Sequence, residues 1–170
     1  TNVSRALADS EYGTWKEQCL GAAATIGRKL PKVRTLRDLN PREFHQVGAP
    51  LLTDEVVRRR AQFIVEENFR GLEMTLALVQ DNREEVRRLT ADSFAGMRDL
   101  YGKTVTEMEA MYAAMSRAPG AIGCRQSGGG FGGCLIAYVE ADKVAAFSAA
   151  VSTAYREATG IDATVFGTIS

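Results

Sequence analysis

The sequence predicts an α+β fold, in which a small and largely antiparallel sheet packs against helices that include a long antiparallel helical hairpin. Two observations support this class. Up to Arg117, apolar residues recur mostly at steps of three and four, which is the period of an amphipathic helix. After the Pro119-Gly120 pair the pattern changes to short extended runs, and from residue 83 onward the predicted order is α-α-β-β-α-β.

Start and stop signals divide the helical part. Asn40, Pro41 and Glu43 form a start signal, because Asn can cap a helix, Pro suits its first turn and Glu can reach back to the cap amide. Thr53 is expected to cap the longest helix, and the segment Thr104–Glu107 is expected to form another capping box. The expected helices cover residues 10–28, 41–47, 54–80, 83–101 and 105–117.

The C-terminal part is expected to alternate strands with one helix. Strands are predicted at 121–127, 134–139 and 163–169, and residues 1–3 are a possible extra strand. The middle strand is a continuous apolar run and is therefore expected to be buried. A helix over 141–159 separates the last two strands, with Gly160 as its stop.

Composition excludes several classes of protein. Twenty-one basic residues balance twenty-one acidic ones, which disfavours a nucleic-acid binder, since such proteins rely on excess positive charge. Three cysteines without a C-x-x-C pair exclude a disulfide framework and a zinc ribbon, and they favour the reducing cytoplasm. His45 is the only histidine, so no His-based metal site is expected. No apolar run approaches the length of a membrane span, and no signal-peptide pattern is present.

One segment carries a pattern with chemical meaning. Five of the six residues from Gly128 to Gly133 are glycine, which costs backbone entropy and so indicates a specific need. Consecutive glycines let backbone N–H groups converge on an anion such as phosphate. A dinucleotide fingerprint is rejected, because a strand and not a helix follows at Cys134, and the G-K-[ST] ending of a P-loop is absent. The structural alternative is a sharply bent connection between two strands.

The string Arg125-Gln126-Ser127-Gly128-Gly129-Gly130-Phe131-Gly132-Gly133-Cys134 resembles the third motif of the GHMP small-molecule kinases, and within them that of the galactokinases. Three further stretches are similar, in the same order. They are Asn2-Val3 with Leu7–Tyr12, Arg58–Ala61 with Val65–Asn68, and Asp92–Phe94 with Met97–Tyr101. The resemblance runs along the whole chain and covers the C-terminal domain of the family, so residues 1–170 are expected to be that one domain.

This resemblance implies a fold, an activity and a site. The fold is the ferredoxin-like C-terminal domain, and the reaction is phosphorylation of galactose at its anomeric hydroxyl by ATP with Mg²⁺. Tyr12 matches the tyrosine whose hydroxyl approaches the sugar, a role that suits a phenol. The backbone of the glycine segment is implied to support the phosphate side of the site. Its members are Ser127, Gly128, Gly129, Gly130, Phe131, Gly132 and Gly133.

The resemblance also implies what this chain lacks. The sugar-binding first motif, the Gly-Leu-Ser-Ser-Ser phosphate loop and the catalytic Asp of the family are absent, so no catalytic residue and no metal ligand is assigned. ATP and Mg²⁺ are expected to bind mainly to an N-terminal domain, and the chain alone is expected to be inactive. The opening at Thr1 rather than Met suggests a piece of a longer protein.

Departures from the family pattern leave the sugar open. The usual His of one motif is Phe94, and the usual Thr before the glycines is Ser127. N-acetylgalactosamine and arabinose kinases share much of the pattern, and a non-catalytic module that binds a small molecule or another chain is the alternative from a different class. A separated half is also expected to expose an apolar face, which we would look for along the glycine segment and the first helix.

Simple structural roles are assigned to the remaining noticeable residues. Trp15, Cys124 and Cys134 are expected to be packed in the core, as is the stripe of Met108, Met111 and Met115. The run Arg58–Arg60 is expected on a solvated helix face, and no partner is expected for His45.

Overall fold

The computed structural model describes residues 1–3, 8–128 and 133–167, with the side chains of the first helix described from Gly13 onward. The chain forms two compact units. The sheet unit consists of Thr1–Ala6, Ala77–Phe94 and Lys103–Ser170, and the helical unit consists of Leu7–Leu76 and Ala95–Gly102.

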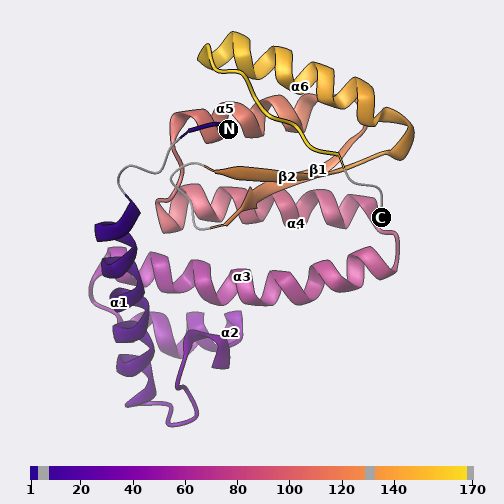
Figure 1. Cartoon of the computed structure of the whole chain (residues 1–170). Helices are drawn as coiled ribbons and strands as arrows, with labels where there is room; N and C mark the ends of the chain where they lie inside the picture. Colours follow the sequence, from indigo (N-terminus) through magenta and orange to yellow (C-terminus); the bar gives the residue numbers. More distant parts are fainter. Residues whose placement is uncertain (4–7, 129–132, 168–170) are drawn as a thin grey trace. The chain divides into compact units, whose positions relative to one another are not determined.

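The sheet unit is built around a two-stranded antiparallel sheet. Strands β1 (Ala121–Ser127) and β2 (Cys134–Val139) coincide with the predicted ones. Helices α5 (Thr106–Arg117) and α6 (Val144–Thr159) cover one face of the sheet, and α4 (Arg83–Gly96) lies along the other (Figure 1). The α+β class is therefore confirmed.

Three predicted features of the sheet unit are wrong. Residues 161–167 are irregular and join no ladder, so the described part of the predicted last strand is absent. Residues 1–3 are likewise irregular. Helix α5 begins without the predicted capping box, because Val105 occupies the cap position and Thr104 instead donates a hydrogen bond to Glu109, at 2.8 Å.

The core of the sheet unit lies between β1, α5 and α6. It contains two of the three predicted methionines, and the third, Met108, is also fully buried. Tyr155 is fully buried as well, and burial raises the pKa of its hydroxyl above the ordinary value. The buried members of this core are Met111, Ala114, Met115, Ala118, Cys124, Phe147, Val151 and Tyr155.

Gly123 lets β1 approach α4 closely. A Cβ atom at this position would lie 2.4 Å from the hydroxyl oxygen of Thr90 and 3.2 Å from the carbonyl oxygen of Val86. The Thr90 side chain cannot easily move, because it is buried and donates to the Val86 carbonyl at 2.8 Å. The strand and the helix therefore fit together only without a side chain at Gly123.

The helical unit contains α1 (Ala8–Gly27), α2 (Pro41–Glu43) and most of α3 (Glu55–Val79). The predicted capping box at α2 is confirmed, since Asn40 and Glu43 bond each other's backbone N–H groups. Helix α3 is capped by Asp54 and not by Thr53, because the Asp54 carboxylate accepts from Val56 and Val57 at 2.8 and 3.1 Å. A carboxylate one residue further along thus replaces the predicted hydroxyl.

The core of the helical unit is apolar, and Ile26, Phe44, Ala61 and Val65 are completely shielded from solvent. Its buried members are Ala22, Ala23, Ile26, Val33, Leu36, Leu39, Phe44, Leu52, Ala61 and Val65.

Two single π-helical turns interrupt the regular geometry of this unit. One spans Phe44–Gly48 and the other spans Met97–Tyr101, where the N–H of Gly102 donates to the carbonyl of Met97. Gly102 then ends the helix in the left-handed region, at φ 72°, which agrees with the predicted helix end at residue 101. Such turns insert one residue into a helix and often occur at functional positions.

The longest exposed apolar stripe in the helical unit lies on α3. Phe69, Leu72 and Leu76 are 43%, 66% and 61% exposed and follow at helical steps of three and four. The prediction placed an apolar face along the glycine segment and the first helix. In the helical unit the exposed apolar stripe lies on α3 instead, and Leu20 of α1 is exposed as well. Within the described residues, no helix combines the length and the hydropathy that crossing a membrane requires.

Candidate functional site

The glycine segment forms the connection between the two strands. Ser127 pairs with Cys134 where the ladder ends, and Gly128 and Gly133 flank the bend with φ of 85° and 96°. Only glycine adopts such angles without strain, so these two positions are fixed by the turn itself. The predicted positions Gly129, Gly130, Phe131 and Gly132 lie outside the described residues.

The base of this hairpin is held by the first residue of the chain. The backbone nitrogen and the hydroxyl of Thr1 donate to the Gly133 carbonyl at 3.0 and 2.9 Å. The Tyr155 hydroxyl in turn donates to the Thr1 carbonyl at 2.8 Å. Asn2 continues the contact by donating to the Asp162 carbonyl at 2.7 Å. Segments from both ends of the sequence therefore meet at the glycine hairpin.

Tyr12, the predicted sugar contact, lies in the first turns of α1. Its side chain is outside the described part of the chain, so its role remains a prediction. The described neighbour in the same helix, Trp15, is buried as expected. Its ring lies edge-on to Tyr101 at 5.4 Å and under the guanidinium of Arg60 at 4.7 Å.

Gln126 is a candidate that the sequence did not single out. Its side chain is buried beside the hairpin, yet neither the amide nitrogen nor the amide oxygen has a hydrogen-bond partner. A buried amide without partners costs stability, and in natural proteins such a group points to a ligand, a water or a neighbouring chain. The motif contained this residue, but nothing in its type or spacing predicted that its amide would be left unpaired.

We expect Gln126→Met to stabilise the isolated chain by about 1–3 kcal/mol, because it removes two unpaired polar atoms and keeps the side-chain volume. Urea unfolding followed by circular dichroism measures the change. Gln62→Met is the matched control, since the Gln62 amide donates to Glu66 at 2.9 Å and its loss brings no gain. A loss of stability in Gln126→Met would show that the amide is already paired.

The three thiols differ in their surroundings. Cys124 is buried as predicted, and desolvation raises the pKa of its thiol to about 12, so it stays protonated and unreactive near neutral pH. Cys134 is exposed, which corrects the expectation of a core thiol. The apolar run of β2 is less buried than expected. Leu135 and Ala137 are half-buried, whereas Cys134 and Ile136, which alternate with them, are exposed.

Two predictions about charged residues also need correction. His45 does have a partner, because its Nε2 lies 3.2 Å from a carboxylate oxygen of Glu66, twenty-one residues away. The run Arg58–Arg60 is only partly solvated, since Arg59 donates to the carbonyl of Asp99 and Arg60 stacks over Trp15. Both contacts depend on long-range packing that sequence spacing does not show.

Acidic, thiol and imidazole groups do not gather into a metal site in the described ranges. Over residues 1–3, 8–128 and 133–167, no three or more His, Cys, Asp or Glu side chains are placed to hold an ion.

Comparison with known proteins places this geometry in context. Residues 74–157 match the family model described as GHMP kinases C terminal. The chain is 36% identical over 163 residues to galactokinase of Lactiplantibacillus plantarum and 34% identical to galactokinase of Bacillus subtilis. These matches cover 96% of this chain but only 42% and 41% of the two relatives, so the chain spans about two fifths of their length.

A solved structure shows the same arrangement. The crystal structure of Lactococcus lactis galactokinase complexed with galactose matches with a TM-score of 0.87 and 32% identity. The match covers 95% of this chain and 41% of that one. Both units of the chain therefore have counterparts in that structure.

Proposed function

We propose that this chain, whose residues 74–157 match the family model of the GHMP kinases C terminal, is the C-terminal part of a galactose kinase that uses ATP. The main support is the likeness of nearly the whole chain, at a TM-score of 0.87, to part of a galactokinase solved with galactose. The glycine motif from Ser127 to Gly133 adds support, because it lies on a hairpin whose ends have the backbone angles that the motif requires.

In the proposed reaction, the anomeric hydroxyl oxygen of galactose forms a bond to the γ-phosphorus of ATP. The bond from that phosphorus to the bridging oxygen breaks, ADP leaves, and the hydroxyl proton is released. Catalysis of this kind depends on positioning and on stabilising charge. Mg²⁺ supplies charge neutralisation on the phosphates when bound, and the part of the enzyme that this chain does not span is proposed to hold it.

The residues of this chain have supporting roles in this proposal. Tyr12 contacts the sugar through its hydroxyl. The backbone of Ser127, Gly128 and Gly133, with the four residues between them, supports the phosphate side of the site. Thr1 and Tyr155 are positioning residues, because their hydrogen bonds hold the base of the hairpin. No group in this chain is proposed to take the hydroxyl proton.

A chimera tests the proposal. The matching C-terminal part of the Bacillus subtilis galactokinase is replaced by this chain, and ADP release is measured with galactose, N-acetylgalactosamine and arabinose. We expect turnover with galactose in the chimera and none in the isolated chain. Gly128→Ala in the chimera is expected to lower kcat/KM about tenfold or more, because a Cβ atom strains the backbone at φ 85°. The control Ser116→Ala, on exposed α5 surface, is expected to leave it unchanged.

Each other result has a defined meaning. A folded chimera that prefers N-acetylgalactosamine or arabinose overturns the assigned sugar and keeps the kinase. A folded chimera without turnover on any sugar overturns the kinase and favours a non-catalytic binding module. Circular dichroism and the melting temperature of the chimera establish that it is folded.

A further inference from the structure

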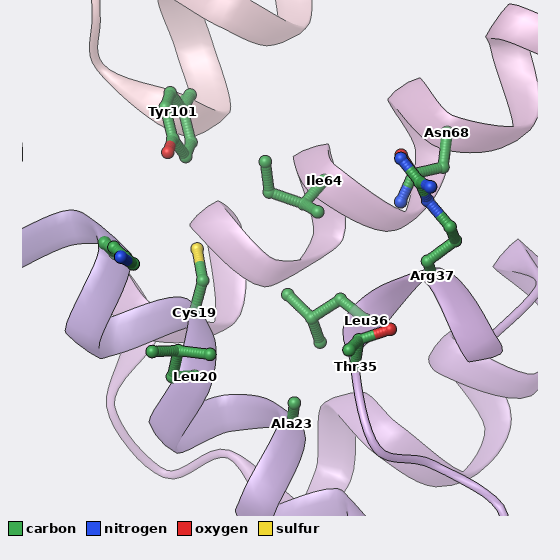
Figure 2. Close-up of a pocket in the computed structure, with 10 residues that line it drawn as sticks. Cys19, Leu20, Ala23, Thr35, Leu36, Arg37, Ile64, Asn68 and Tyr101 are labelled. Atoms are coloured by element: carbon green, nitrogen blue, oxygen red, sulfur yellow. The ribbon is translucent and has the colours of Figure 1, made fainter.

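The helical unit contains a cavity that the proposed kinase reaction does not use. Its volume is about 440 Å³, which lies in the range of small-molecule sites. The walls come from α1, the turn Thr35–Arg37, α3 and the π-helical turn that ends at Tyr101 (Figure 2). The lining residues are Lys16, Cys19, Leu20, Ala23, Thr35, Leu36, Arg37, Ile64, Asn68 and Tyr101.

The interior of the cavity is apolar. Leu36 and Ile64 face the space from two sides, and the sulfur of Cys19 is directed into it (Figure 2). Leu20 also lines the cavity and is 55% exposed. A ligand with an apolar body would remove this surface from water, which favours binding.

The charge of the cavity has one sign. Lys16 and Arg37 line it, and no acidic residue does. Among the described residues, neither cation forms an ion pair. The adjacent Asp38 carboxylate is already engaged, because it accepts from the backbone N–H groups of Arg34 and Thr35 at 2.9 and 2.8 Å. The two cations are therefore available to an anionic ligand.

A donor pair lies at one end of the cavity. Arg37 and Asn68 both line the cavity, and Figure 2 draws their side chains on the same side of it. A guanidinium presents paired N–H donors that match a carboxylate, and an amide adds a further donor. This end is polar and cationic, whereas the centre of the cavity is apolar.

The opposite wall is fixed in place. The Tyr101 ring packs edge-on against Trp15 at 5.4 Å and lies 5.1 Å from the ring of Phe63. Arg60 in turn covers the face of Trp15. A wall that is already ordered loses little entropy when a ligand binds. It also connects the cavity to Trp15, the single tryptophan of the chain.

From these observations we infer that the cavity binds a small carboxylate with an aliphatic body, held by Arg37 and Asn68 at its charged end and by Leu20, Leu36 and Ile64 along its chain. This inference does not rest on the proposed kinase reaction, because none of its contacts involves ATP or a sugar.

Decanoate is the probe, and decanol, which has the same chain without the charge, is its matched control. Binding to the full 170-residue chain is followed by Trp15 fluorescence, without ATP or sugar present. A Cys134→Ser background leaves Cys19 as the accessible thiol, since Cys124 is buried. We expect decanoate to bind at least tenfold more tightly than decanol and to slow alkylation of Cys19 by iodoacetamide.

Two arginine variants identify the site. Arg37→Gln is expected to weaken decanoate binding about tenfold and to leave decanol unchanged. Arg42→Gln, which alters an equally exposed arginine outside the cavity, is expected to change neither. Equal binding of decanoate and decanol, binding that does not protect Cys19, or equal effects of the two arginine variants would each overturn the inference. Circular dichroism confirms that every variant is folded.

Discussion

Gly123→Ala is expected to destabilise the sheet unit by about 3 kcal/mol, at the upper end of the range for an overpacked core. The added methyl group would lie 2.4 Å from the Thr90 hydroxyl oxygen and 3.3 Å from the Cα of Arg87. Part of this obstacle is backbone of α4, so rotation of a side chain cannot relieve it. Urea unfolding followed by circular dichroism measures the loss.

Two further variants separate this clash from a general effect of replacing glycine. Thr90→Ala removes the nearest atom, and in combination with Gly123→Ala it is expected to cost less than the sum of the two single variants. Gly71→Ala in α3 is the matched control, because nothing lies within 4 Å of its added Cβ atom. It is expected to stabilise the helix by up to about 1 kcal/mol. Equal losses at Gly123 and Gly71 would contradict the close approach of β1 and α4.

Phe44→Ala is expected to destabilise the helical unit by about 3–5 kcal/mol, the usual cost of deleting a fully buried aromatic ring. The Phe44 side chain has no exposed surface and lies in the core with Ile26 and Val65. Thermal unfolding followed by circular dichroism at 222 nm measures the effect, and a lower melting temperature is the expected result.

Phe69→Ala is the matched control for Phe44→Ala, since it deletes the same ring from the same unit at a position that is 43% exposed. Its cost is expected to be below about 1 kcal/mol. Similar losses for both variants would mean that the surface stripe of α3 is covered in solution, and the burial of Phe44 would then not explain its effect.

Local signals predicted much of the fold. The sequence predicts these features because each depends on a few neighbouring residues. They are the strands β1 and β2, the capping box at Asn40 and the helix stops at Gly102 and Gly160. Glycine, which has no Cβ atom, accepts left-handed backbone angles in most contexts, and Asn, with its short amide, caps helices in most contexts. The sequence therefore suffices where the determining contacts are local.

Long-range contacts account for what was missed. The partner of His45 is Glu66, and only the packing of the helical unit brings them together. The exposure of Cys134 belongs to an alternation of exposed and half-buried residues at the start of β2, which an apolar run does not reveal. The unpaired amide of Gln126 is a property of the assembled core. The glycine hairpin was recognisable as a motif, but its attachment to Thr1 was not.

Because Met97–Tyr101 is a π-helical turn, the position of the Tyr101 ring in the cavity wall depends on the number of residues in that turn as well as on their types. An α-helix advances about 100° per residue, so deleting one residue there would restore ordinary winding and swing the Tyr101 ring by that angle. The ring would leave its contacts with the rings of Trp15 and Phe63. Deletion of one residue would thus open this wall without any substitution. Related proteins would then differ in the ligand they bind through the rotation of one helical segment alone.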